Sequence, residues 1–355
     1  MFLRVLCLIG ILFAKEGCCE NTNAIVKNYQ ENFYKLPLLK QEHFSVRMYL
    51  LTGDTHYITP IVSYSYFLSQ RYQRVLAMLD HPRLIAAEEN TLLSLNKKST
   101  KKRKRYNQYI ARFSGMSFYL NLLIITNKAF SYHLENTPLF PDTARAVRAL
   151  KRQKKAFKAF ILNETSIKVY SAQLINYVVY LHDLGIIDLI KPYTEQFRAI
   201  FPDTQDDALS TIDYESKIYG LTHFITAASR YYKNLVSYQD YRWIIDYFEN
   251  NIDQIIARTE NDVIAEVGVC LLLVAHDHSV ALEKIKRHLN KEFDSKHALI
   301  KSKSNNTDFI YGEHRNILTL MIFNWKKHIG NDPFIDTELN KVLHNGIDST
   351  LKTSL

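Results

Sequence analysis

Apolar residues recur with a helical period of about 3.6 along nearly the whole chain, and short polar breaks separate the periodic segments. Some of these segments have one apolar and one polar face, which is typical of helices on the outside of a protein. Five predicted helices are of this kind: Thr59–Leu79, Thr143–Leu162, Tyr238–Ile256, Val280–Phe293 and Ile335–Leu351.

A second kind of segment is apolar around most of its circumference and carries a narrow polar stripe near its N-terminal end. Such helices are usually buried on all sides. Six predicted helices share this pattern: Glu42–Leu51, Ile110–Ile125, Tyr170–His182, Tyr219–Tyr232, Asp262–His276 and Glu313–Trp325. Their first polar positions are 43, 114, 173, 222, 262 and 313, so each interval has room for one outer helix and two connections.

This alternation predicts an all-α fold, specifically an α/α toroid of about six helical hairpins whose inner helices present their N-terminal ends to one face. An open solenoid of helical hairpins would give the same pattern. We favour the closed ring because the polar residues keep to the same end of the inner helices. The composition agrees with helices, since 355 residues include only 10 Gly and 8 Pro, too few for a turn-rich sandwich, barrel or doubly wound sheet.

The first residues have the pattern of an export signal. Arg4 precedes an apolar run over 5–14 that is too short to span a bilayer, and no later stretch is long and apolar enough to do so. We expect cleavage after Ala14 or Ala24, a signal segment within 1–24, one toroid-like domain over 25–355, and a periplasmic or secreted protein. Lipid anchoring through Cys18 is the less favoured alternative, because the preceding charges do not suit such a signal.

The formal net charge of +9 is concentrated in two segments. A basic loop is expected over 97–105, and seven more bases lie between Arg145 and Lys158 on the polar face of one helix. Without these 14 bases, 31 of the 45 remain, against 36 acids. The segments therefore predict an anionic partner, and the export signal favours an acidic glycan or lipid head groups over nucleic acid.

Three motifs carry a family resemblance. They are Ile-Tyr-Gly-Leu-Thr-His at 218–223, Asp-Val-Ile-Ala-Glu-Val-Gly at 262–268 and Glu-His-Arg-Asn at 313–316. Through them the chain resembles an uncharacterised family of exported bacterial proteins known only as a domain of unknown function. The resemblance implies no activity, so expectations about function come from the residues.

If the ring closes, the polar ends of the inner helices converge on one site. Closed helical rings resemble the scaffolds of many glycan-active enzymes, so a glycan is the expected substrate. The expected catalytic residues are Glu266, Glu313, His223 and Asp262. The expected substrate-binding residues are His43, Arg47, Gln173, Asn176, Tyr219, His314 and Asn316. Glu266 stands out because a carboxylate inside an apolar helix must be paired, hydrogen-bonded or in contact with water; its alternative role is structural, as the partner of Arg47 or His223.

Two reactions fit these residues. In a glycoside hydrolase, one carboxyl group would protonate the glycosidic oxygen and another would activate water or attack the anomeric carbon. In a polysaccharide lyase, His223 or Tyr219 would be the base, and Arg47, Arg315 or Asn316 would neutralise an acidic sugar. No cofactor is expected. The candidate metal ligands are His223, Glu266, Glu313 and His314, and they lack a short-range signature such as His-Glu-x-x-His. The alternative class is a non-catalytic envelope protein that binds anionic glycan or lipid through the basic segments.

Overall fold

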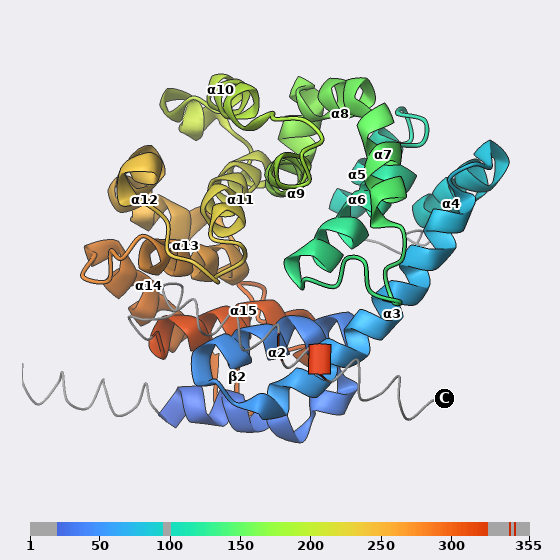
Figure 1. Ribbon diagram of the computed structural model, residues 1–355. Helices are drawn as coiled ribbons and strands as arrows, with labels where there is room; N and C mark the ends of the chain where they lie inside the picture. The colour runs from blue at the N-terminus through green and yellow to red at the C-terminus, as the bar shows by residue number, and fades with distance from the viewer. Residues whose placement is uncertain (1–19, 95–100, 326–340, 342–343, 346–355) are drawn as a thin grey trace, which may run out of the picture. The chain divides into compact units, whose positions relative to one another are not determined.

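The computed structural model describes residues 20–94, 101–325, 341 and 344–345 (Figure 1). Helices make up 76% of the structure. Within the described ranges the strands are confined to one antiparallel hairpin of β1 (Phe293–Asp294) and β2 (Leu299–Ile300). The all-α prediction is confirmed.

The described chain divides into two compact units. The terminal unit contains residues 20–61 and 229–325, and the central unit contains residues 62–94, 101–228, 341 and 344–345. Each unit has its own buried core, and each is described by itself below. The closed ring over 25–355 stays a prediction.

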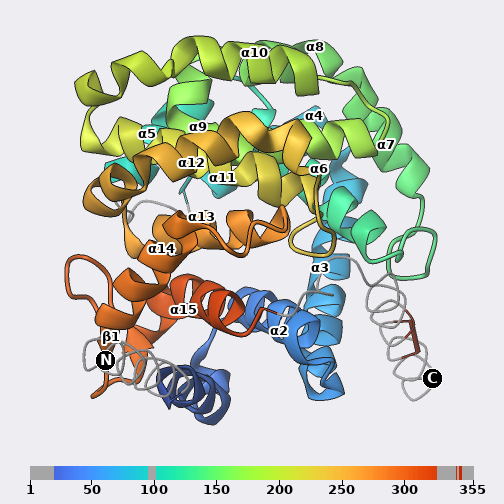
Figure 2. The ribbon, with the colours of Figure 1, turned by 90° about the vertical axis from the view of Figure 1, so that its left-hand side faces the viewer.

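The terminal unit is built around two nearly apolar helices, α13 (Asn261–Leu273) and α15 (Phe309–Phe323). α15 packs against α13 and against α2 (Leu38–Thr52), as Figure 1 shows. α12 (Tyr238–Arg258) and α14 (Val280–Lys291) lie on one side of α13 (Figure 2). The remaining elements are a helix over 20–31, η1 (Phe33–Lys35) and η2 (Thr55–Tyr57).

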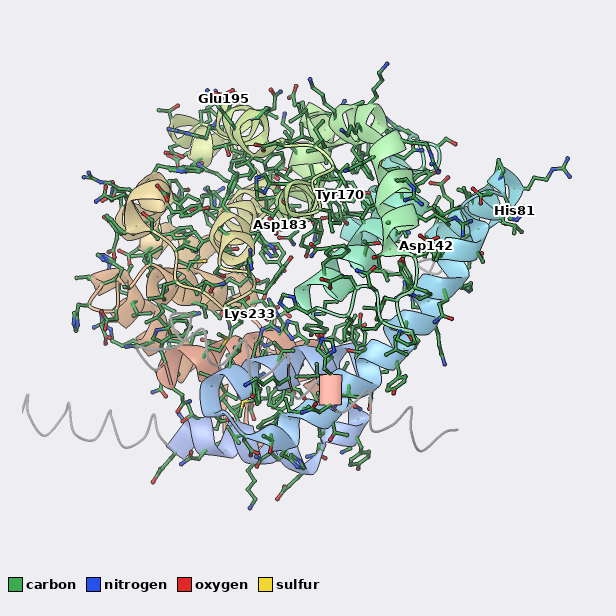
Figure 3. The ribbon with its side chains drawn as sticks, viewed as in Figure 1. His81, Asp142, Tyr170, Asp183, Glu195 and Lys233 are labelled. Atoms are coloured by element: carbon green, nitrogen blue, oxygen red, sulfur yellow. The ribbon has the colours of Figure 1, made fainter. Side chains whose placement is uncertain are left out.

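The central unit is organised around α9 (Glu164–Asp183), which packs against α5, α6, α8, α10 and α11. Its elements in chain order are α3 (Ile58–Met78, entering from the terminal unit), α4 (Pro82–Ser94), α5 (Lys101–Ile110), α6 (Met116–Ser131), α7 (Thr143–Arg152), α8 (Lys154–Ile161), α9, α10 (Ile190–Ile200), η3 (Asp203–Ala208) and α11 (Thr211–Ala228). Tyr170, labelled in Figure 3, interrupts the helical dihedral angles of α9 and contacts Tyr106 of α5 and Phe160 of α8.

Two glycines allow helices to approach closely, one in each unit. A Cβ at Gly220 would lie 2.9 Å from Cβ of Ser171 and 2.7 Å from the ring of Phe197. A Cβ at Gly268 would lie 2.7 Å from the Ile322 side chain. Both glycines belong to the motifs at 218–223 and 262–268, which explains part of those motifs by packing.

Several boundaries differ from the sequence prediction, and local backbone chemistry explains them. The helix expected over 110–125 begins later, at Met116, because Gly115 adopts a left-handed conformation with φ of 79°. The outer helix expected over 143–162 is broken into α7 and α8 at Gln153. Residues 101–105, expected in a basic loop, lie in α5, since lysine and arginine are good helix formers.

Three further predictions concern residues that are not described. Residues 1–19 of the expected signal and nearly all of the tail helix expected over 335–351 lie outside the described residues, as do positions 97–100 of the expected loop. Within the part of the chain that is described, no helix combines the length and the apolar character needed to cross a membrane.

Candidate functional site

Three helices of the terminal unit bring their polar stripes together. His43 on α2 lies with Nδ1 2.7 Å from Oε1 of Glu313 on α15. His314, the next residue of α15, lies with Nε2 2.9 Å from Oε1 of Glu266 on α13. The two imidazole rings are 5.2 Å apart between centroids. The four residues form two adjacent histidine–carboxylate pairs.

The position of α15 explains how one helix serves both pairs. Asp308 begins the helix, because its carboxylate accepts a hydrogen bond from the backbone N–H of Tyr311. Successive residues of an α-helix point about 100° apart. Glu313 and His314 therefore reach different neighbours, and α15 packs against α2 and α13.

The carboxylates are buried and the imidazole rings reach solvent. The side chains of Glu313 and Glu266 are 1% and 2% exposed, whereas those of His43 and His314 are 25% and 23% exposed. A carboxylate this deep must have a hydrogen-bond partner to be stable in its ionised form. The histidines supply such partners and also present the face of the cluster that a ligand can reach.

The environment pushes the pKa values of the two histidines in opposite directions. Burial and the positive charge of Arg47 lower the pKa of His43 to about 4, against the opposing effect of Glu313. Burial also acts to lower the pKa of His314, but the hydrogen bond and negative charge of Glu266 outweigh it and raise that pKa above its ordinary value. His43 is therefore neutral near pH 7, and His314 is the more readily protonated ring.

The ionised state of Glu313 determines the tautomer of His43. Burial opposes ionisation of Glu313, yet His43, Lys40 and His314 together hold its pKa at about 2. An ionised carboxylate only accepts hydrogen bonds. Nδ1 of neutral His43 therefore carries the proton and donates a hydrogen bond to Glu313. The other nitrogen of His43, Nε2, is left with its lone pair.

Two cationic side chains lie beside the pairs. Lys40 on α2 has Nζ 3.5 Å from Oε2 of Glu313. Arg47, one turn beyond His43, donates from a terminal nitrogen to the carbonyl of His43 at 2.7 Å, and its guanidinium carbon lies 4.8 Å from the ring centroid of Tyr232. Nε of Arg47 is buried and has no hydrogen-bond partner among the described residues. The cluster thus combines two histidine–carboxylate pairs with two cationic side chains of α2.

The Tyr232 that packs on Arg47 is held by an unusual stretch of backbone. Arg230, Tyr231 and Tyr232 have φ of 53°, 57° and 76°, three consecutive left-handed residues of which none is glycine. Each costs roughly 1–2 kcal/mol relative to an ordinary conformation. The turn is tied back by the hydroxyl of Ser229, which accepts from the backbone N–H of Tyr232 at 2.9 Å.

The remaining predicted residues of the terminal unit lie at the edge of the cluster. Asp262 is 34% exposed, pairs with Arg315 at 3.5 Å, and has its pKa raised by burial. Asn316 is fully buried, accepting from the backbone N–H of Ile300 and donating to the carbonyl of Gly312. Arg315 donates to the carbonyl of Ile300. Arg315 and Asn316 therefore hold β2 against α15.

The other predicted residues lie in the central unit. Nδ1 of His223 on α11 lies 3.0 Å from the amide oxygen of Asn176 on α9, and the ring of Tyr219 packs edge-on against His223. The hydroxyl of Tyr106 donates to the side-chain oxygen of Gln173. Gln173, Asn176, Tyr219 and His223 are all partly exposed, so their amide, phenol and imidazole groups reach solvent.

No group of three or more histidine, cysteine, aspartate or glutamate side chains with metal-binding geometry occurs among the described residues. The chemistry that the terminal unit can perform with its own side chains is proton transfer and anion binding. The protein is therefore all-α, and its candidate site is a cluster of two histidine–carboxylate pairs.

The chain belongs to the family described as domain of unknown function DUF3541, whose model matches residues 19–346. The match confirms the resemblance to an uncharacterised domain family and covers both units. No curated protein and no solved structure matches the chain significantly.

Sequence reasoning missed two members of the cluster. Lys40 stands three residues before His43 on the same helix face, so helical spacing could have identified it. Tyr232 could not be identified in this way, because the helix predicted through it ends at Ala228 and the left-handed turn brings it to Arg47.

Proposed function

We propose that this protein is a glycan-active enzyme of the polysaccharide-lyase type, with its catalytic site at the two histidine–carboxylate pairs of the terminal unit. The observation that carries the proposal is that two partly exposed histidines lie side by side, each held by a buried carboxylate, with pKa values shifted in opposite directions. Neighbouring groups tuned apart in this way suit a general base and a general acid.

In the proposed reaction, Nε2 of His43 removes the proton at C5 of a uronate residue. The C5–H electron pair forms a C4=C5 double bond as the C4–O bond breaks, and protonated His314 gives its proton to the departing oxygen. The products are one chain end with an unsaturated uronate and one with a free hydroxyl. His43 ends protonated and His314 neutral, and exchange with water restores both.

An anionic substrate fits the charges around His43. Lys40 can reach a sugar carboxylate, and the buried charge of Arg47 adds to the positive potential there, which makes the C5 proton easier to remove. The charge of Arg47 contributes to the low pKa of His43 in the free protein. A bound carboxylate would offset that charge, raise the pKa of His43 and make it a stronger base.

The geometry favours a lyase over a hydrolase. A hydrolase of the common type needs two carboxyl groups that reach the sugar. Glu266 and Glu313 are almost wholly buried and are occupied by His314 and His43. In this proposal the two glutamates act as positioning residues, and Asp262 is the carboxyl group of the cluster that solvent reaches most easily.

We also propose that the protein is exported and that cleavage after Ala14 is preferred to cleavage after Ala24. The apolar run over 5–14 suits an export signal. Residues 20–31 form a helix in which Thr22 and Ile25 are buried, and Asn21 donates to the side chain of Asn290. Cleavage after Ala24 would remove the first turn of this helix. Protein recovered from the periplasm or medium should begin at Lys15 by N-terminal sequencing.

A direct assay follows the ultraviolet absorbance of the new C4=C5 bond with polygalacturonate, alginate and glucuronate-containing glycans as substrates. His43→Gln and His314→Gln should each lower turnover of the best substrate by at least about 10²-fold, the low end of what a positioned acid or base contributes. His278→Gln is the matched control, because His278 is a 91% exposed histidine of the same unit.

Release of reducing ends without an unsaturated product would assign the site to a hydrolase. Equal turnover by all three variants would reject the site. No turnover of any glycan in the panel by the unmodified protein would reject the proposed lyase activity on these substrate classes.

A further inference from the structure

A run of exposed bases lies in the central unit, on α7 and α8. Five exposed bases follow one another within eight residues: Lys151, Arg152, Lys154, Lys155 and Lys158. We call them the basic face. Within the described chain none of the five forms an ion pair, whereas Arg145 lies 2.5 Å from Asp80 and Arg148 lies 3.9 Å from Asp142, which is labelled in Figure 3.

Several other exposed helices pair bases with acids one turn away. Lys191 and Glu195 pair on α10, Arg242 and Asp246 on α12, and Lys286 and Glu283 on α14. Such pairs are the ordinary arrangement on a solvated helix face. The basic face departs from it because Asp142 is the only acid between 141 and 163.

The start of α8 makes the arrangement less favourable still for the free protein. Lys154 and Lys155 occupy the first turn of α8, which contains no acid. Cations at a helix N-terminus oppose the helix dipole. Repulsion among the five bases and this misplaced charge would both be relieved by an anionic ligand.

The packing holds the basic face outward and continuous across the break at Gln153. Leu150 at the end of α7 and Phe157 and Phe160 in α8 are fully buried, which fixes both helices to the unit. A shallow surface hollow lies at the end of α8, lined by Lys155, Lys158, Ala159, Leu162 and Asn163. It gives the face a place where one anionic group can be approached by two lysines.

We infer that the basic face is a binding surface for a soluble acidic polysaccharide, separate from the histidine–carboxylate pairs and independent of the activity proposed for them. No large apolar side chain is exposed between 141 and 163, so α7 and α8 offer nothing to insert into a membrane. The aromatic rings of this segment are buried, so none can stack on nucleic-acid bases. A hydrated chain with regularly repeated carboxylate or sulfate groups is the ligand that exposed lysines alone can hold.

The test measures binding of polygalacturonate and of heparin to the full chain by calorimetry at several salt concentrations. The variant is Lys151→Gln, Lys154→Gln, Lys155→Gln and Lys158→Gln together. It should bind at least about tenfold more weakly than the unmodified chain and lose much of the salt dependence, because each lysine removed is one fewer counterion-releasing contact. The matched control changes four exposed lysines elsewhere, Lys27, Lys168, Lys191 and Lys291, to Gln and carries the same net charge.

The helical circular dichroism of both variants should match that of the unmodified chain, and the melting temperature of the four-lysine variant should be equal or higher, because repulsion among the bases is removed. The double variant Lys151→Gln, Lys154→Gln provides a milder second measurement and should give an intermediate loss. Equal weakening in the four-lysine variant and its control would overturn the inference, since net charge alone would then explain binding. Tighter binding to phosphatidylglycerol vesicles or to duplex DNA than to both polysaccharides would also overturn it, in favour of a membrane or nucleic acid. The variant His43→Gln should still bind both polysaccharides, whether or not it changes turnover.

Discussion

Each of the two units holds partly exposed histidine side chains on buried helices, but the hydrogen-bond partners of these histidines differ between the units. In the terminal unit His43 and His314 contact carboxylates, whereas in the central unit His223 contacts the amide of Asn176. An amide orients a ring but does not ionise, so it adds no charge to the pair. A buried carboxylate orients the ring and also changes the free energy of its protonation. The carboxylates of the terminal unit therefore change the proton affinity of His43 and His314, whereas the central unit offers an amide and an aromatic ring to His223.

The largest expected effect comes from making one terminal pair resemble the central one. Glu266→Gln replaces the carboxylate that faces His314 with an amide, as in the pair of His223 and Asn176. The pKa of His314 should fall, so the alkaline limb of the kcat/KM profile should move to lower pH, with turnover lowered by about 10²-fold near neutral pH. A pH-rate profile checks this, and the melting temperature checks the fold. A lower melting temperature with an unmoved alkaline limb would show that Glu266 is only structural.

The second effect concerns stability in acid. Glu313 has a pKa of about 2 in the folded protein, below its ordinary value, so its contribution is present above the ordinary value and is lost as the pH falls toward 2. This contribution is on the order of 2–3 kcal/mol. His43, with its lowered pKa, acts in the same direction between its ordinary value and about 4. Urea denaturation between pH 7 and pH 3 should show a steep loss that Glu313→Gln reduces; parallel curves for the two proteins would contradict the pairing.

The third effect compares the cores of the two units. Gly220→Ala places a methyl group against the ring of Phe197 and Cβ of Ser171, whereas Gly268→Ala meets mainly the end of the Ile322 side chain, which can move. Both should destabilise by about 1–3 kcal/mol, with the larger loss at Gly220. Thermal melts give the ranking, and hydrogen exchange shows which unit opens. Greater damage from Gly268→Ala would indicate that α13 and α15 are the more rigid contact.

The smallest effect tests the contact between Asn176 and His223 directly. Asn176→Ala removes the amide that holds His223 and should lower the free energy of unfolding by about 1 kcal/mol, the usual contribution of one neutral hydrogen bond, with both limbs of the pH profile unchanged. Thermal melts and a pH-rate profile measure the two effects, and His182→Ala on the exposed end of α9 is the control. A moved pH limb would place the proton chemistry in the central unit and would reverse the comparison.

The sequence predicted the helices far better than it predicted their contacts. Periodicity identified α2, α9, α13 and α15 because their polar residues interrupt long apolar runs. It could not foresee Gly115 delaying α6, the break at Gln153, or α4, α5 and α10, whose patterns are weaker or more polar. Those features depend on local dihedral angles and on tertiary packing.

The candidate site was predicted as a set of residues but not as a set of pairs. His43, Glu266, Glu313 and His314 were all expected, because polar residues in apolar helices are conspicuous. Glu266 was expected to be catalytic, with Arg47 or His223 as its partner in the structural alternative, and its hydrogen bond to His314 was not foreseen. Which polar residues meet depends on how each helix is rotated about its axis, and the period of a sequence does not specify that rotation for two helices far apart in the chain.

The distance between His43 and Glu313 along the chain has a consequence for how the protein is made. The two residues are 270 positions apart, and residues 62–228 of the central unit lie between them. At ribosomal rates of about 5–20 residues per second, α2 emerges tens of seconds before α15 can meet it. During that interval the apolar faces of α2 lack their partner helix and need protection, while residues 62–228 can already collapse into a unit. A chain interrupted before α15 would therefore keep its central unit and leave His43 without its carboxylate.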